Sequence, residues 1–198
     1  MKWIGLTGGI ATGKSTVKNK LVSLNIPVID ADMISHEITQ AGGLGYEQIV
    51  SHFGKDILNA DQSLNRKQLG DIVFNDAQKL LKLEQILHPI IQAEVQTRKK
   101  KHYEAGEAFC FYDVPLLYEK KLEAQFDQIV LVYAPVTTQV ERIMVRNNLT
   151  HTQALARINA QLPMSQKINR AHHCLDNSTN QDDLNLQVLN LVNVLKSK

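Results

Sequence analysis

The sequence has 198 residues, of which 43% are hydrophobic and 21% are charged, and its formal net charge at pH 7 is +2. These values are typical of a globular chain that builds one good core, or one core with a smaller attached subdomain. A net charge this small provides no strong field for a nucleic acid or a membrane surface, so neither is an expected partner. No apolar run approaches the roughly 20 residues that span a bilayer, and no signal segment is recognisable, so we expect a cytoplasmic protein.

The first feature along the chain is a phosphate loop, residues 8–16, which read GGIATGKST and fit the pattern G-x-x-x-x-G-K-[ST]. The apolar segment KWIGLT before the loop predicts a buried strand, and the apolar spacing after it predicts a helix. In such a loop backbone N–H groups face the phosphates, the lysine supplies a positive charge, and the hydroxyl ligates Mg²⁺. Four residues occupy the fixed positions and predict a nucleotide site: Gly8, Gly13, Lys14 and Ser15.

Five short apolar or β-branched runs are predicted strands, at residues 2–6, 26–30, 108–113, 128–133 and 172–176. They alternate with helical patterns, which indicates an α/β fold with a five-stranded parallel sheet covered by helices on both faces. Ligands of such sheets bind at the carboxyl ends of the strands. That edge collects the phosphate loop and several polar residues: Asp30, Asp32, Asp113, Asp176 and Asn177.

Two of the connections between predicted strands are longer than a βαβ crossover requires. Residues 32–105 hold several helical patterns and are predicted to form a helical insert, whose long last helix Pro89 should kink or break. Residues 136–168 carry three arginines, and Thr150 is a predicted N-cap there. The remaining residues, 1–31, 106–135 and 169–198, would form the core, closed by an amphipathic C-terminal helix. This layout is typical of a small-molecule kinase, in which 136–168 would be a lid that excludes water.

Several other residues favour ordinary structural roles. Cys110 and Cys174 lie in apolar runs without C-x-x-C spacing, so we expect buried, reduced thiols. The basic run at 98–102 is expected to be a solvated helix end. The adjacent His172 and His173 lack the i, i+4 spacing of helical metal ligands.

A set of motifs distributed over almost the whole chain resembles the dephospho-coenzyme A kinase family. These motifs, in order, are GLTGGIATGKSTV, VIDADMI, LNRKQLGDIVF, LEQILHPII, DVPLLYE, TTQVERIMVRN, ARINAQLP and LDNS. The resemblance implies a fold like that of nucleoside monophosphate kinases. It also implies the last step of coenzyme A synthesis, in which ATP phosphorylates the ribose 3′-hydroxyl of dephospho-CoA, with Mg²⁺ and without an obligate protein partner.

The resemblance also implies roles for individual residues. Asp32 matches the carboxylate near the acceptor hydroxyl, Arg142 and Arg146 match lid arginines that approach the transferring phosphate, and Asn177 matches an adenine contact. His36 departs from the family pattern, where an arginine is usual, and Ala41 stands where a proline is frequent. The expected ATP contacts are Gly8, Gly9, Ala11, Thr12, Gly13, Lys14, Ser15 and Thr16, and the expected acceptor contacts are Asp32, Arg66, His88 and Pro89.

The residue types fit phosphoryl transfer, in which a protein mainly positions the reactants and neutralises charge. Planar guanidinium groups suit bidentate phosphate contact, whereas for Arg157 a surface charge is the preferred interpretation. Asp32 could accept the hydroxyl proton or cap the helix that follows it, and Asp30 could cap that helix or orient Mg²⁺. Asp113 could support Mg²⁺, directly or through water, or form a turn before Val-Pro.

Three other functions make different predictions for this sequence. A regulatory GTPase should carry an N-K-x-D guanine-binding motif, but Asn19-Lys20 is followed by Leu21-Val22 inside the first helix. A kinase of another metabolite would be distinguished by an acceptor screen. A noncatalytic nucleotide-binding module would leave Asp32 and the two arginines without a role and would show no turnover.

Overall fold

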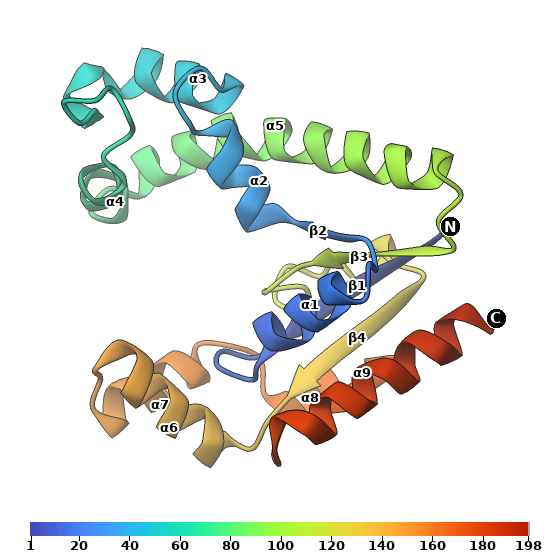
Figure 1. Cartoon of the computed structure of the whole chain (residues 1–198). Helices are drawn as coiled ribbons and strands as arrows, with labels where there is room; N and C mark the ends of the chain where they lie inside the picture. Colours follow the sequence, from blue (N-terminus) through green and yellow to red (C-terminus); the bar gives the residue numbers. More distant parts are fainter. Residues whose placement is uncertain (198) are drawn as a thin grey trace. The chain divides into compact units, whose positions relative to one another are not determined.

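The structure is a computed structural model that describes residues 1–197 (Figure 1). The chain forms two compact units: residues 1–29 together with the chain from residue 102 onward, and residues 30–101. Within residues 1–197 no helix has both the length and the apolar character that crossing a bilayer requires.

The first unit is built on a parallel sheet. Its strands are β1 (Lys2–Gly8), β2 (Val28–Asp30), β3 (Phe109–Asp113), β4 (Gln128–Tyr133) and β5 (His173–Asp176), in the spatial order β2-β3-β1-β4-β5. β1 pairs in parallel with β3 and β4, and β4 pairs in parallel with β5. The predicted five-stranded parallel sheet is therefore confirmed. The prediction succeeds because a chain in which apolar strands alternate with helices buries those strands best in a parallel sheet covered by the helices.

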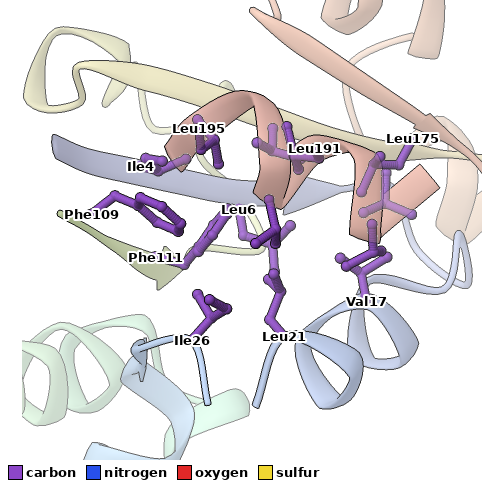
Figure 2. Close-up of a cluster of buried hydrophobic side chains, with 14 of the residues drawn as sticks. Ile4, Leu6, Val17, Leu21, Ile26, Phe109, Phe111, Leu175, Leu191 and Leu195 are labelled. Atoms are coloured by element: carbon purple, nitrogen blue, oxygen red, sulfur yellow. The ribbon is translucent and has the colours of Figure 1, made fainter. Parts of the chain in front are cut away.

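One face of this sheet packs against α1 (Lys14–Ser23) and α9 (Gln181–Lys196). Ile4 and Leu6 of β1 point to this face, where Val17 and Leu21 of α1 meet them (Figure 2). Alternate residues of a strand point to opposite faces, which is why Ile4 and Leu6 share a core that Trp3 and Gly5 do not. The amphipathic C-terminal helix is confirmed, and it buries Leu184, Val188, Leu191, Val192 and Leu195.

The other face of the sheet packs against the segment 114–126, which includes the short helix η2 (Glu123–Gln125), and against α8 (Met164–Ile168). A Cβ on Gly5 would lie 2.7 Å from the Leu117 side chain, so this segment approaches the strand closely. Cys110 on β3 is buried, as predicted. Cys174 on β5 is exposed, which corrects the prediction, because β5 is an edge strand with a single neighbour.

Helices α6 (Val136–Asn147) and α7 (His151–Asn159) pack together through Val140, Ile143 and Ala154. The predicted N-cap Thr150 is confirmed: its hydroxyl accepts from the Gln153 backbone N–H, and the Gln153 side chain accepts from the Thr150 N–H. This reciprocal pair is a capping box, which satisfies two amides that the start of a helix leaves unpaired.

The second unit is helical, with α2 (Ala31–Ile38), α3 (Leu44–Phe53), η1 (Lys55–Ile57), α4 (Arg66–Phe74) and most of α5 (Ala77–Glu104). Its core comprises Ile49, Ile57, Leu64, Leu69, Val73 and Ile86. Arg98, in the basic run of α5, pairs with Glu37 and Glu94 instead of being only a solvated charge. These two carboxylates raise the pKa of Arg98.

Pro89 was predicted to kink or break the long helix. The break is contradicted, because α5 continues through Pro89 without interruption, and the kink stays a prediction. Proline removes one backbone hydrogen bond and crowds the preceding turn. Ile86 and Val95, buried on either side of Pro89, hold both halves of the helix in place by packing.

Candidate active site

The phosphate loop joins the carboxyl end of β1 to the start of α1. Gly13 is the N-cap of α1 with a left-handed φ of 94°, and no side chain caps the helix. The first amides of a helix have no acceptor within the helix, and here no acidic residue stands in the first turn. The start of α1 is therefore a set of N–H groups suited to an anion.

Glycine is required at two positions of this loop. At Gly13 a side chain would overlap the Asn177 amide, in addition to the strain of its positive φ. At Gly8 a Cβ would lie 2.6 Å from Thr12 Oγ1 and 2.8 Å from the Val132 carbonyl oxygen. The glycine spacing of the motif thus reflects close packing of the loop against β4 and the segment after β5.

Lys14, the lysine of the motif, forms an ion pair with Asp113 at the end of β3. The Asp113 side chain is 4% exposed, and the ammonium of Lys18, one turn along α1, lies 3.9 Å from its other carboxylate oxygen. Two cations thus compensate one buried carboxylate beside the loop. Asp113 is the last residue of β3, as predicted, and its carboxylate pairs with Lys14.

Arg142 of α6 reaches the loop. Its guanidinium donates to the carbonyl oxygens of Ala11 at 3.3 Å and Asn177 at 3.2 Å. Arg146, one turn later, is exposed and donates to the neighbouring Asn147 side chain at 3.1 Å. The two arginines were predicted as a pair, but Arg142 is anchored to the backbone whereas Arg146 is not.

Asn177 is buried and acts within the protein. Its side-chain amide donates to the Thr12 carbonyl oxygen at 2.9 Å, and its backbone N–H donates to Tyr133. Asp176 before it is partly buried, which by itself raises its pKa, but hydrogen bonds from Ser178 and Tyr133 outweigh burial and lower that pKa. The segment that follows β5 is thereby held against the phosphate loop.

These elements enclose a cleft of about 850 Å³, here called the nucleotide cleft. The phosphate-loop residues line it together with Arg142, Arg146 and Asn177, so the structure brings this part of the prediction together. Six other lining residues were not among the predicted site residues: Pro115, Glu141, Val145, Gln161, Thr179 and Gln181. Gln161 stands in the motif ARINAQLP, which was the one available signal for it.

The predicted acceptor contacts Asp32, Arg66, His88 and Pro89 belong to the second unit. Asp30 is the N-cap of α2, and its carboxylate accepts from the backbone N–H groups of Asp32 and Met33. Of the two carboxylates considered as the cap, Asp30 therefore fills that role and Asp32 is exposed in the first turn. Arg66 donates to the Thr39 hydroxyl at 2.7 Å, while His36, His88 and Pro89 are exposed.

The structure combines a parallel sheet with a phosphate loop at the end of β1. A lysine belongs to that loop, and an arginine contacts the loop. This combination defines the class of P-loop kinases. The fold agrees with a solved shikimate kinase from Acinetobacter baumannii, which has a TM-score of 0.54 at 19% identity over 100% of this chain and 96% of that one. The family model described as dephospho-CoA kinase matches residues 2–183, and the chain belongs to that family.

Relatives with that name match nearly the whole chain. Dephospho-CoA kinase of Listeria innocua is 43% identical over 191 residues, covering 96% of both proteins. The solved structure of dephospho-CoA kinase from Campylobacter jejuni is 30% identical, with a TM-score of 0.74 over 98% of both chains. The resemblance found in the sequence motifs is confirmed.

Proposed function

We propose that this protein transfers the γ-phosphoryl group of ATP to the ribose 3′-hydroxyl of dephospho-CoA, giving coenzyme A and ADP, the last step of coenzyme A synthesis. Membership in the family supports the reaction. The single structural observation that carries the nucleotide half of the proposal is the uncapped start of α1 beside Lys14. We further propose that the enzyme is cytoplasmic and needs no protein partner.

The phosphate loop, residues 8–16 with Lys14, would hold the ATP phosphates. Phosphoryl transfer passes through a loose transition state with charge spread over the phosphoryl oxygens, so fixed N–H groups and cations aimed at those oxygens lower the barrier. Arg142 would hold its side of the loop in place, since its guanidinium is bonded to Ala11 and Asn177. Arg146, exposed on the wall of the cleft, is the arginine with freedom to meet the transferring group.

Mg²⁺ would be held by the Ser15 hydroxyl and by Asp113, directly or through water. Both are oxygen donors of the kind that Mg²⁺ takes, one or two from the protein and the rest from phosphates and water. Ser15 lines the cleft, and Asp113 is paired with Lys14, which also lines it. Within residues 1–197 no three His, Cys, Asp or Glu side chains gather where they could hold a metal ion. When bound, the ion would neutralise charge on the phosphates.

The acceptor would be bound by residues of the helical insert, 32–105. Asp32 is exposed and free of the capping role that Asp30 fills, so its carboxylate is available to orient the acceptor hydroxyl or take its proton. Arg66, His88 and Pro89 are the other proposed acceptor contacts. Residues 136–168, with α6 and α7, would act as the lid that excludes water from the reaction.

The experiment is incubation with ATP, Mg²⁺ and dephospho-CoA, followed by mass spectrometry of the product and NMR assignment of the phosphorylated oxygen. We expect one added phosphoryl group, on the 3′-oxygen. Parallel reactions with adenosine monophosphate, shikimate or gluconate as acceptor test the other metabolite kinases. No coenzyme A over a range of Mg²⁺ concentration and pH, or faster transfer to another acceptor, would refute the proposal.

A further inference from the structure

Gln161 joins the end of the α6–α7 segment to the phosphate loop. It lies two residues after the last residue of α7, and its side-chain Oε1 accepts a hydrogen bond of 2.9 Å from the backbone N–H of Ile10. The two residues are 151 positions apart in the sequence. Gln161 is half-buried and lines the nucleotide cleft.

The segment that carries Gln161 is itself held firmly. The next residue, Leu162, donates its backbone N–H to Glu119 Oε1 at 3.1 Å, and the same oxygen lies 2.6 Å from the Lys167 ammonium. The Lys167 side chain is only 1% exposed, so this ion pair is a fixed internal support. On the loop side, a Cβ on Gly9 would lie 2.8 Å from the Met164 methyl group.

The loop residue that follows the contact with Gln161 is strained. Ala11, directly after Ile10, has a φ of 58°, a left-handed conformation that is unfavourable for a residue with a Cβ. Two side chains hold the strained stretch from either side: Gln161 accepts from the Ile10 N–H, and Arg142 donates to the Ala11 carbonyl oxygen. Thr12 completes the turn by donating its N–H and hydroxyl to Gly9.

We propose that Gln161 is a positioning residue, which holds the loop at the Ile10 N–H so that Ala11 keeps the strained conformation that aims the phosphate-loop N–H groups at ATP. Gln161 acts through the loop rather than on the reacting atoms. The support from Glu119 and Lys167 fixes its distance from the loop, so nucleotide binding is linked to the position of the chain that leaves α7. The inference rests on the proposed nucleotide site.

The test is the affinity for ATP and Mg²⁺, measured by calorimetry, in Gln161→Met and in a matched control, Gln166→Met. Methionine has nearly the length of glutamine but no strong acceptor for the Ile10 N–H. Gln166 is exposed on α8, so its replacement tests the effect of the methionine alone. We expect Gln161→Met to bind ATP about threefold to tenfold more weakly, as the loss of one hydrogen bond predicts, and Gln166→Met to bind like the wild type.

Steady-state kinetics should agree with the binding measurements. In Gln161→Met we expect the KM for ATP to rise by a larger factor than kcat falls. Equal or tighter ATP binding by Gln161→Met would overturn the proposal, and tighter binding would mean that Gln161 competes with phosphate for the Ile10 amide. If the wild type itself binds no ATP, the proposed nucleotide site fails, which is a separate outcome.

A double-mutant cycle with Ala11→Gly tests the strain directly. Glycine adopts the left-handed conformation without penalty, so the loop should depend less on Gln161 in that background. We expect Gln161→Met to lose clearly less ATP affinity when residue 11 is glycine. An equal loss in both backgrounds would show that Gln161 does not act by keeping Ala11 in its strained conformation.

Discussion

The ammonium of Lys14 and the carboxylate of Asp113 form an ion pair at the base of the phosphate loop, between residues 99 positions apart in the chain. The pair fixes the ammonium of a lysine that lines the nucleotide cleft. Because Lys18 faces the other oxygen of Asp113, the two lysines share one buried acid but only Lys14 lines the cleft.

Lys14→Met should lower the turnover of coenzyme A formation by roughly 10²-fold or more, because a preorganised charge contact to the phosphates is lost. The protein should stay folded, since Lys18 still compensates Asp113. The control is Lys18→Met, for which we expect turnover close to that of the wild type. Similar rates for both variants in a coupled ADP assay would contradict the proposed contact of Lys14 with the phosphates.

Arg146→Ala should lower kcat more than the affinity for ATP if, as proposed, its exposed guanidinium meets charge that grows in the transition state. Arg142→Ala should weaken both, because this arginine also ties α6 to Ala11 and Asn177. Steady-state kinetics and ATP titration of the two variants separate the roles. A loss of ATP affinity alone in Arg146→Ala would assign it to ground-state binding.

Asp32→Asn should melt near the wild-type temperature and bind ATP, yet transfer the phosphoryl group roughly 10²-fold more slowly, if the carboxylate acts on the acceptor hydroxyl. The capping role belongs to Asp30, so Asp30→Ala should instead lower the free energy of unfolding by about 1 kcal/mol. Melting curves and coenzyme A formation of both variants are the measurements. A fully active Asp32→Asn enzyme would refute the proposed role of Asp32 at the acceptor hydroxyl.

Gly13→Ala should abolish ATP binding or prevent folding, because the new methyl group overlaps the Asn177 amide and the residue has a φ of 94°. Gly42→Ala is the matched control, since Gly42 has a φ of 81° but nothing within 4 Å of the added Cβ. The control should lose only the roughly 1–2 kcal/mol of the left-handed conformation. Equal stability losses, with ATP binding retained in both, would contradict the importance of close packing at Gly13.

The Glu119–Lys167 pair should make stability depend on pH. Burial raises the pKa of Glu119, but the Lys167 hydrogen bond and the other interactions of the carboxylate outweigh burial and hold the pKa below its ordinary value of 4.5. The ionised carboxylate therefore stabilises the fold above that value, and this contribution is lost as the pH falls through the lower pKa of the folded protein.

Urea unfolding of wild type and Glu119→Gln should show the larger difference at pH 7 and a shrinking difference below about pH 4.5. The replacement leaves Lys167 buried without its carboxylate at neutral pH, whereas a protonated Glu119 resembles glutamine. Glu84→Gln, on the exposed side of α5, is the control and should match the wild type at each pH. A difference that does not change with pH would refute the ionic role.

Local patterns in the sequence determined the five strands, the phosphate loop, the helices of the insert and the Thr150 cap. The reason is that each depends on residues close together in the chain: apolar periodicity, glycine spacing and capping side chains. The ordered motifs also led to the family. The same local information did not decide between a kink and a break at Pro89, where the helix continues with Ile86 and Val95 buried on either side. It failed at Cys174, because exposure follows from the edge position of β5.

Tertiary structure alone decided which partners the site residues have. The pairing of Lys14 with Asp113, the anchoring of Arg142 to Ala11 and Asn177, and the contact of Gln161 with Ile10 all join residues far apart in sequence. Such contacts arise where separate strands and helices end at one edge of the sheet, and no local pattern encodes them. The choice between Asp30 and Asp32 as the cap was likewise decided by backbone geometry, because both residues are aspartates and could cap a helix equally well.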